Sequence, residues 1–258
     1  MLSKSDSMLA EKFIFFPTKE ILQTPKDYGI EFKEFKFPSG NGAKIVSWLI
    51  ELGEDTPLLL FFHGNAGNIG DRSENLALLS RWEISSFIID YQGYGKSEGK
   101  PGELACYQDA RASYQFLREE LKIPKERIFL FGRSLGGAVA VDLAQEIDFP
   151  AVILESTFTS FSDLVARFVP SLARSLKNKF NSLEKISRLR SPLLFIHGDM
   201  DEIVPYENGR KLFESAPQPK EFYTIAGAGH NDTYLVGGEE YFEKIKEFLW
   251  RYFKRSKK

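Results

Sequence analysis

The first regular pattern of hydrophobic and polar residues is at 31–37, where charged and aromatic side chains alternate. A period of two is typical of a strand with one exposed face. The Ser-Gly-Asn-Gly sequence at 39–42 is a strong turn signal, and residues 43–50 form the next apolar run. The sequence therefore predicts an antiparallel hairpin near the start of the chain.

After this hairpin, short apolar runs alternate with longer stretches in which apolar residues have helical spacing. Nearly continuous apolar strands are typical of parallel sheets buried on both faces. We therefore predict an α/β fold with a mostly parallel central sheet and helices on both faces. The strands are expected at 58–62, 84–90, 127–131, 151–154, 193–196 and 222–225, and the helices at 68–82, 103–121, 138–145, 206–215 and 239–253.

The stretch between the predicted strands at 151–154 and 193–196 has phenylalanine and leucine at helical intervals and no strand signal. Pro170 is expected to separate two short helices within it. The stretch follows the carboxyl end of a strand, where α/β sheets place their ligand crevice. We predict a single domain over residues 1–258, with 157–190 as a small helical cap. The alternative is an ordinary amphipathic crossover packed on the sheet.

Composition narrows the class of protein. A length of 258 residues suits one α/β domain, and a net charge of −2 gives no electrostatic case for nucleic-acid binding. A single cysteine, Cys106, excludes an internal disulfide framework and favours a reducing, cytoplasmic location. Three histidines and one cysteine argue against a dedicated zinc site.

The two ends of the chain have segments that could meet a membrane. The apolar run at 8–16 is interrupted by Glu11 and Lys12, so it is too short for a secretory signal or a membrane span. We expect it to pack on the domain; the alternative is a peripheral membrane contact. The basic residues at 254–258 predict a solvated helix terminus, with binding of anionic lipid as the alternative.

The candidate chemistry centres on the Gly-x-Ser-x-Gly sequence at 132–136, between a predicted strand and a predicted helix. This pattern is typical of a nucleophile elbow, a turn so sharp that the serine side chain stands clear of both elements. Gly132 and Gly136 are expected because a Cβ at either position would collide with the packed strand or helix. Ser134 is therefore the candidate nucleophile. The alternative is a glycine-rich loop with an incidental serine.

A serine nucleophile needs a base, and the base needs an acid that fixes its tautomer. On this type of fold the chain order is serine, carboxylate, histidine. His230 follows the last predicted strand in a glycine-rich loop, so it is the candidate base. The other histidines, His63 and His197, directly follow strands and are interpreted as scaffold residues. The candidate acids after the strand at 193–196 are Asp199, Asp201 and Glu202, which spacing alone does not separate.

The oxyanion formed during acyl transfer needs two N–H donors. One is expected from Leu135, the residue after the nucleophile, and the other from Asn65 in the loop after the strand at 58–62. A phosphate-binding loop is the alternative for the glycines at 64, 67 and 70. It lacks the Gly-Lys-Ser/Thr and Gly-x-Gly-x-x-Gly patterns. No cofactor or metal is implied.

Five segments follow one another along the chain: FFHGNAGNIG (61–70), DYQGYGKSEG (90–99), GRSLGGAVA (132–140), HGDMDEIVP (197–205) and GHND (229–232). Together they resemble the α/β-hydrolase superfamily, and most closely its small serine hydrolases near α/β-hydrolase-domain protein thirteen and the fungal bud-emergence homologues. The family pattern His-Gly-x-x-Asp before x-x-Val-Pro implies Asp201 as the acid. The family often has arginine where this chain has Gln92, and many relatives carry a membrane helix before the Phe-Phe-Pro segment.

The resemblance implies the α/β-hydrolase fold with a short cap, and a serine hydrolase acting through an acyl-enzyme. The expected substrate is a small-molecule or lipid-like ester or thioester. Two alternatives remain open, an aminopeptidase-type amide hydrolase and a binding protein that has kept the scaffold and lost the chemistry. The oligomeric state does not follow from the sequence.

Overall fold

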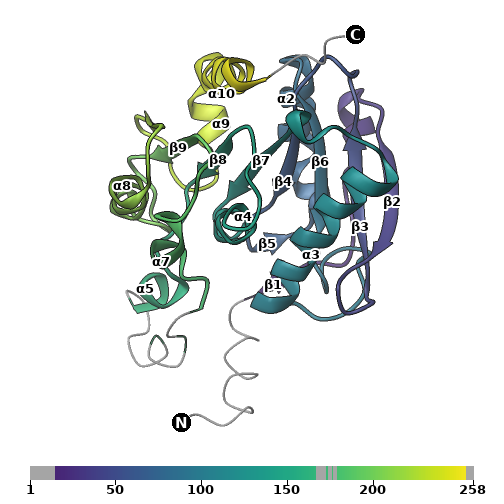
Figure 1. Ribbon diagram of the computed structural model, residues 1–258, viewed down its shortest axis with the longest axis horizontal. Helices are drawn as coiled ribbons and strands as arrows, with labels where there is room; N and C mark the ends of the chain where they lie inside the picture. Colours follow the sequence, from purple (N-terminus) through teal and green to yellow (C-terminus); the bar gives the residue numbers. More distant parts are fainter. Residues whose placement is uncertain (1–14, 167–172, 174–175, 177–178, 254–258) are drawn as a thin grey trace.

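The computed structural model describes residues 15–166, 173, 176 and 179–253. Its central element is an eight-stranded sheet in the order β10-β9-β8-β7-β4-β6-β3-β2 (Figure 1). The six neighbouring strands β10, β9, β8, β7, β4 and β6 run parallel to one another. β3 is antiparallel to β6, and β2 is antiparallel to β3. The strands are β2 (Lys33–Pro38), β3 (Lys44–Ile50), β4 (Leu58–Phe62), β6 (Ser85–Asp90), β7 (Ile128–Arg133), β8 (Val152–Glu155), β9 (Leu193–Gly198) and β10 (Lys220–Ile225).

Helices cover both faces of this sheet because its strands are apolar on both sides. In β4, Leu58, Leu60 and Phe62 pack into one core, whereas Leu59 and Phe61 pack into the other. The predicted mostly parallel α/β sheet with an opening hairpin is confirmed. The first core is covered by α3 (Glu103–Gln115), α4 (Leu135–Ala144) and α8 (Tyr206–Ser215), and the second by α2 (Ser73–Arg81) and α10 (Gly238–Tyr252).

Two predicted helices are wrong at their ends. The stretch predicted as a helix from 68 begins as a 3-10 turn, Ile69–Arg72, before α2 starts. The Asn68 side chain accepts a hydrogen bond from the Gly70 N–H, and Asp71 accepts one from the Asn68 N–H, so side chains cap this tight turn. The helix predicted over 103–121 ends at Gln115 and continues as a π-helical turn, Phe116–Glu120.

Several short elements were not predicted from the sequence, including the 3-10 turns η1 (Pro25–Tyr28) and η4 (Lys125–Arg127). β1 (Phe16–Pro17) and β5 (Ala66–Gly67) pair in a small parallel sheet, and α9 (Thr233–Val236) follows the loop that carries His230. The pairing of Phe16 with Ala66 brings the start of the described chain beside the loop after β4. Elements of two to four residues carry no periodic signal, so the sequence pattern could not reveal them.

The predicted cap at 157–190 is described only in part. It contains α5 (Phe161–Ala166) and α7 (Ser182–Ile186), and Pro170 lies outside the described residues. The segments at 1–14 and 254–258, for which membrane contacts were considered, also lie outside them. No helix among the described residues has the length and apolar character needed to cross a bilayer. The single-domain division with a cap therefore stays a prediction.

Candidate active site

Ser134 occupies a strained turn between β7 and α4. Its backbone has φ 53° and ψ −116°, a conformation that side-chain-bearing residues rarely adopt. The surroundings hold this conformation: the Ser134 N–H donates to the Glu155 carbonyl at 2.9 Å, and the Thr157 hydroxyl donates to the Ser134 carbonyl at 2.6 Å. Strain that neighbouring hydrogen bonds maintain is typical of functional residues.

The glycines of the elbow are required for the predicted reason. A Cβ on Gly136 would lie 1.9 Å from the Phe62 carbonyl oxygen, and a Cβ on Gly132 would lie 2.4 Å from the Gly136 carbonyl oxygen. Gly137 is equally constrained, because its Cβ would lie 1.6 Å from Thr157 Oγ1. The start of α4 therefore packs directly on the ends of β4 and β7, and this close packing sets the position of Ser134.

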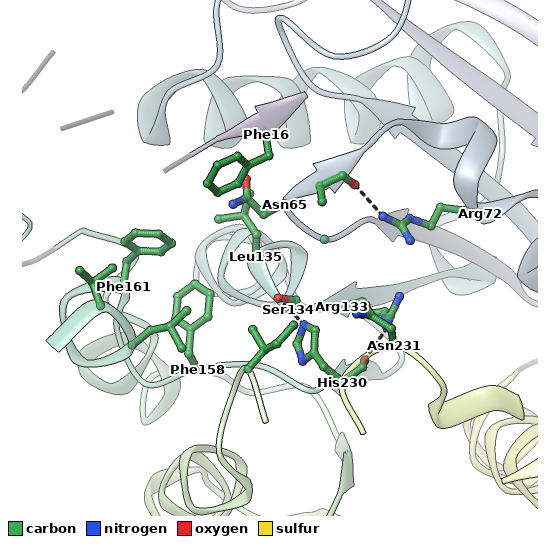
Figure 2. A pocket seen from close by; sticks show the side chains of 15 residues that line it. Phe16, Asn65, Arg72, Arg133, Ser134, Leu135, Phe158, Phe161, His230 and Asn231 are labelled. Atoms are coloured by element: carbon green, nitrogen blue, oxygen red, sulfur yellow. Dashed lines mark hydrogen bonds between the residues drawn. The ribbon is translucent and has the colours of Figure 1, made fainter. Parts of the chain in front are cut away.

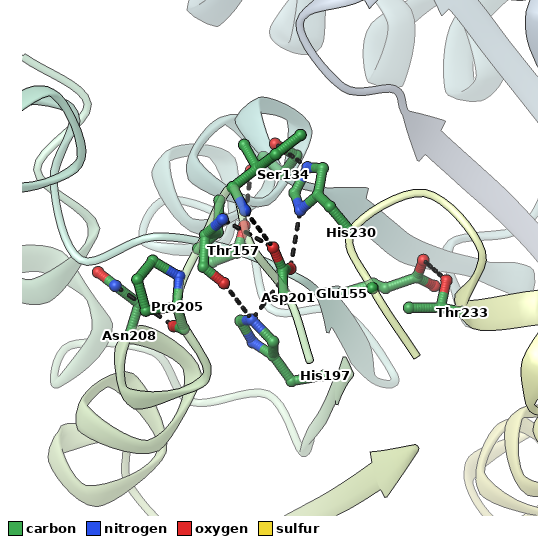
Figure 3. A network of polar contacts seen from close by, with 12 residues as sticks. Ser134, Glu155, Thr157, His197, Asp201, Pro205, Asn208, His230 and Thr233 are labelled. Atoms are coloured by element: carbon green, nitrogen blue, oxygen red, sulfur yellow. Dashed lines mark hydrogen bonds and ion pairs between the residues drawn. The ribbon is translucent and has the colours of Figure 1, made fainter. Parts of the chain in front are cut away.

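Ser134, His230 and Asp201 form one hydrogen-bonded chain (Figure 3). His230 Nδ1 lies 2.8 Å from Asp201 Oδ2, and His230 Nε2 lies 3.1 Å from Ser134 Oγ. A carboxylate only accepts hydrogen bonds, so Nδ1 carries the proton and Nε2 is left to accept from the serine hydroxyl. The three residues follow β7, β9 and β10, whose parallel carboxyl ends share one edge of the sheet.

Asp201 is held in its ionised form by several donors. Its Oδ1 accepts hydrogen bonds from the N–H groups of Ile203 and Val204 at 3.0 and 2.7 Å. Burial raises the pKa of the Asp201 carboxyl, but hydrogen bonds from His197 and His230 outweigh burial and lower this pKa well below its usual value. Asp201 therefore remains a carboxylate that can orient His230 at neutral pH.

The other candidate acids have different contacts. Asp199 Oδ1 accepts from the Gly227 N–H at 2.7 Å, and Glu202 Oε2 lies 3.4 Å from the His230 backbone nitrogen. Residue spacing left open which of the three carboxylates is the acid. Asp201 is the one of them that contacts the His230 ring. Asp199 and Glu202 instead contact the backbone of the loop that carries His230.

The two remaining histidines have the scaffold positions expected for them. His197 Nε2 donates to the Val204 carbonyl at 2.9 Å and lies 3.3 Å from Asp201 Oδ2, so it braces the loop that carries Asp201. His63 is fully buried and its Nδ1 donates to the Gly64 carbonyl at 2.7 Å. Among the described residues, no group of three or more His, Cys, Asp or Glu is arranged to hold a metal ion.

The two predicted oxyanion donors lie beside Ser134. Leu135 is the first residue of α4, where backbone N–H groups have no acceptor in a preceding helical turn. A Cβ on Gly64 would lie 3.5 Å from the Ser134 Cβ, so the loop that carries Asn65 approaches the serine closely. The Tyr94 hydroxyl contacts both the Asn65 carbonyl and the Asn65 Oδ1, at 2.7 and 2.9 Å, and fixes this loop. The donor roles of Leu135 and Asn65 stay predictions.

A network that sequence reasoning missed holds the loop of His230. The Arg133 guanidinium donates to the His230 carbonyl at 2.5 Å, and its Nε lies 3.1 Å from Glu155 Oε1. Glu155 in turn accepts hydrogen bonds from the hydroxyls of Thr233 and Tyr241, at 2.7 and 2.5 Å. Arg133, the first variable position of the Gly-x-Ser-x-Gly pattern, thereby connects the end of β7 to the loop that carries His230.

The Arg133→Lys variant is expected to lower kcat about tenfold with a smaller change in KM. Lysine keeps a positive charge near Glu155 but lacks the planar fork that also reaches the His230 carbonyl, and small displacements of a catalytic group are costly. Steady-state kinetics and a melting curve test this expectation. The matched control is Arg111→Lys, which changes an arginine paired with Asp142 between α3 and α4. Equal losses in both variants would contradict a positioning role for Arg133.

Ser134 opens into a cavity of about 570 Å³ (Figure 2). Phe158 and Phe161, which begin the predicted cap, lie along it with Phe16 of β1. Aromatic and aliphatic walls around a few convergent polar groups are typical of small-molecule sites. The other lining residues are Gly64, Asn65, Ala66, Arg72, Arg133, Leu135, Leu164, Val165, Ile203, His230 and Asn231.

The chain is similar to known proteins in sequence and in fold. Residues 53–184 match the model of a family described as serine aminopeptidase, S33. Protein bem46 of Schizosaccharomyces pombe is 35% identical over 244 residues, which cover 90% of this chain and 81% of that protein. The human alpha/beta hydrolase domain-containing protein 17B is 39% identical over 192 residues, 74% of this chain and 65% of that protein. An esterase of Pyrococcus furiosus shares the fold, with a TM-score of 0.77 and 23% identity over 93% of this chain and 100% of that chain.

Proposed function

The chain belongs to the α/β-hydrolase family, and from that premise we propose that it is a serine hydrolase cleaving carboxylic esters or thioesters. The observation that carries this proposal is the hydrogen-bonded chain from Asp201 through His230 to Ser134, at the floor of a largely apolar cavity. An apolar wall suits the hydrocarbon part of an acyl group, and the triad suits acyl transfer.

The proposed reaction has two half-reactions. His230 Nε2 takes the proton of Ser134 as Oγ attacks the carbonyl carbon, and the N–H groups of Leu135 and Asn65 bind the oxyanion. The C–O or C–S bond breaks, and His230 gives its proton to the leaving alcohol or thiol. Water then attacks the acyl-enzyme, with His230 again as base, and releases the acid and free Ser134. Asp201 keeps Nδ1 protonated throughout and stabilises the positive ring.

The name of the matching family, serine aminopeptidase, supports amide cleavage as a second candidate. The same residues would serve it, because the chemistry differs only in the leaving group. A binding protein on this scaffold is a third candidate, and labelling by a fluorophosphonate tests it. We expect Ser134 to be labelled in the folded protein, whereas a folded protein without labelling would favour the binding role.

A series of p-nitrophenyl esters from acetyl to palmitoyl tests the proposed function. We expect kcat/KM to rise with the first added methylenes, at most about fourfold for each, because a buried CH₂ contributes about 0.8 kcal/mol. An aminoacyl p-nitroanilide serves as the comparison substrate, and we expect it to be cleaved far more slowly. A maximum at acetyl would contradict an acyl chain lying against the phenylalanines, and faster anilide cleavage would favour the peptidase.

A further inference from the structure

Two positively charged side chains line the cavity over Ser134. Its lining residues include two arginines, Arg72 and Arg133, and no aspartate or glutamate among the residues that the structure describes. The rest of its wall is apolar or neutral apart from the His230 ring. A charge that faces a cavity of low polarity interacts more strongly with a ligand than the same charge at the surface.

The cavity has two chemically different ends. Figure 2 shows the side chains of Phe158 and Phe161 on one side of Ser134, and those of Arg72 and Arg133 on the other. Ser134 thus lies between a hydrocarbon surface and a cationic one. An ester placed with its carbonyl at Ser134 would extend one part toward each surface.

The two arginines differ in their ion pairs and hydrogen bonds with the rest of the protein. Arg133 forms an ion pair with Glu155 and hydrogen bonds with the loop of His230. Arg72 donates from Nη2 to the Ala66 carbonyl at 2.7 Å, and its buried Nε has no hydrogen-bond acceptor. Within the described part of the chain, Arg133 is in an ion pair, whereas Arg72 is in none and, of the carboxylates, has only the more distant charge of Asp71 acting on it.

Burial, and then the neighbouring charge of Arg133, lower the pKa of the Arg72 guanidinium, which nevertheless stays charged at neutral pH. The charge of Asp71 acts in the opposite direction and raises this pKa. An anion bound beside the guanidinium would favour its positive charge further. Next to this guanidinium a second cavity of about 230 Å³ is lined by Arg72 and Arg133, but also by Asp71 and Glu155. These two carboxylates disfavour a highly charged anion such as a phosphate dianion.

We propose that Arg72 binds a carboxylate on the leaving-group part of the substrate, while the acyl part lies against Phe158 and Phe161. This inference rests on the proposed ester or thioester hydrolysis and assigns its substrate class, namely acyl esters or thioesters of a hydroxy acid or a thiol acid. Arg72 is then a specificity-determining residue, because a planar guanidinium matches a carboxylate through paired hydrogen bonds.

The test compares para-butanoyloxybenzoate with its neutral methyl ester, which has the same acyl group. In the natural protein we expect kcat/KM to be about tenfold higher or more for the carboxylate substrate. Arg72→Gln is expected to lower the ratio of the two kcat/KM values about tenfold, and Arg72→Lys to lower it less. Arg81→Gln is the matched control, because Arg81 is an exposed arginine at the end of α2, and it should leave the ratio unchanged.

Several outcomes would overturn the proposal. If Arg72→Gln lowers kcat/KM for both esters by the same factor, Arg72 acts only by bracing the Ala66 carbonyl. If the natural protein prefers the neutral ester, the cavity does not bind a carboxylate there. The affinity for para-hydroxybenzoate, measured by calorimetry with Ser134→Ala protein, separates this inference from the proposed function. If adding Arg72→Gln to the Ser134→Ala protein raises this dissociation constant about tenfold, the site is supported even if neither ester is cleaved. An unchanged dissociation constant rejects the site.

Discussion

Ser134→Ala is expected to abolish turnover of p-nitrophenyl esters, with kcat lowered by a factor on the order of 10⁶. The substitution removes the one oxygen that lies 3.1 Å from His230 Nε2, and the described geometry places no second hydroxyl in that position. What remains is the slower attack of water in a site that still has the predicted oxyanion donors. Steady-state and burst-phase kinetics with an active-site titration measure the loss.

The fold should survive this change, because alanine keeps the Cβ and the backbone hydrogen bonds of Ser134 to Glu155 and Thr157 do not involve Oγ. The matched control is Ser113→Ala, which removes another buried serine hydroxyl, on α3, that donates to the Ala110 carbonyl. The control should keep its activity. Full activity in the Ser134→Ala protein would show that the hydrolysis uses another nucleophile or comes from a contaminant.

The sequence predicted best what periodicity encodes. The strand at 58–62 has the bounds of β4, because five consecutive apolar residues bury both faces of a central parallel strand. The position of Ser134 was also predictable, since the glycines around it leave no room for a Cβ. The positions of strand ends then fix which loops meet, so His230 was expected at this edge before any contact was known.

The choice of acid was different, because it depends on the shape of one short loop. Asp199, Asp201 and Glu202 all follow β9 within four residues, and residue spacing does not say which one turns inward. The structure answers through backbone contacts, since Asp201 Oδ1 accepts two N–H groups of the turn and leaves Oδ2 for His230. The resemblance to known hydrolases had implied the same residue.

Contacts between distant segments could not be predicted at all. Arg133 and Glu155 contact or support the loop of His230 across about a hundred residues of sequence, and Tyr94 fixes the loop of Asn65 from another part of the chain. Arg133 and Tyr94 lie within segments that carry the resemblance, but residue spacing alone does not say which distant loop each one contacts. Their roles follow from the order of strands in the sheet and from the sharp turns between them.

Gln92, the departure from the family pattern, has a structural role away from the triad. Its side chain donates to Asp109 at 2.8 Å and accepts from Asn41 at 2.8 Å. Burial raises the pKa of Asp109, although hydrogen bonds from Ser39 and Gln92 partly oppose this effect. An arginine at this position would place a positive charge beside that carboxylate. The replacement therefore bears on a polar cluster between the middle of α3 and the turn after β2.

Asp201→Asn is expected to lower kcat about 10⁴-fold with little change in substrate binding. The carboxylate accepts the Nδ1 proton of His230 and keeps Nε2 free to accept from Ser134. An amide that presents its NH₂ to the ring stabilises the opposite tautomer, in which Nε2 carries the proton and cannot act as base. It also removes the negative charge that stabilises the charged ring during the reaction. The measurement is kcat on a p-nitrophenyl ester, together with the rate of fluorophosphonate labelling.

Asp199→Asn is the matched control for this loss, because it removes a neighbouring charge while its side chain can still accept from the Gly227 N–H. We expect it to change kcat by no more than a few fold. A direct consequence separates orientation from simple loss of the fold: the Asp201→Asn protein should keep its melting temperature within several degrees, because the amide oxygen can still accept from the backbone at Ile203 and Val204. Equal losses in the two variants would mean that the negative charge of the loop matters and the contact with His230 does not. A large loss confined to Asp201 would mean that catalysis depends on which nitrogen of His230 carries the proton.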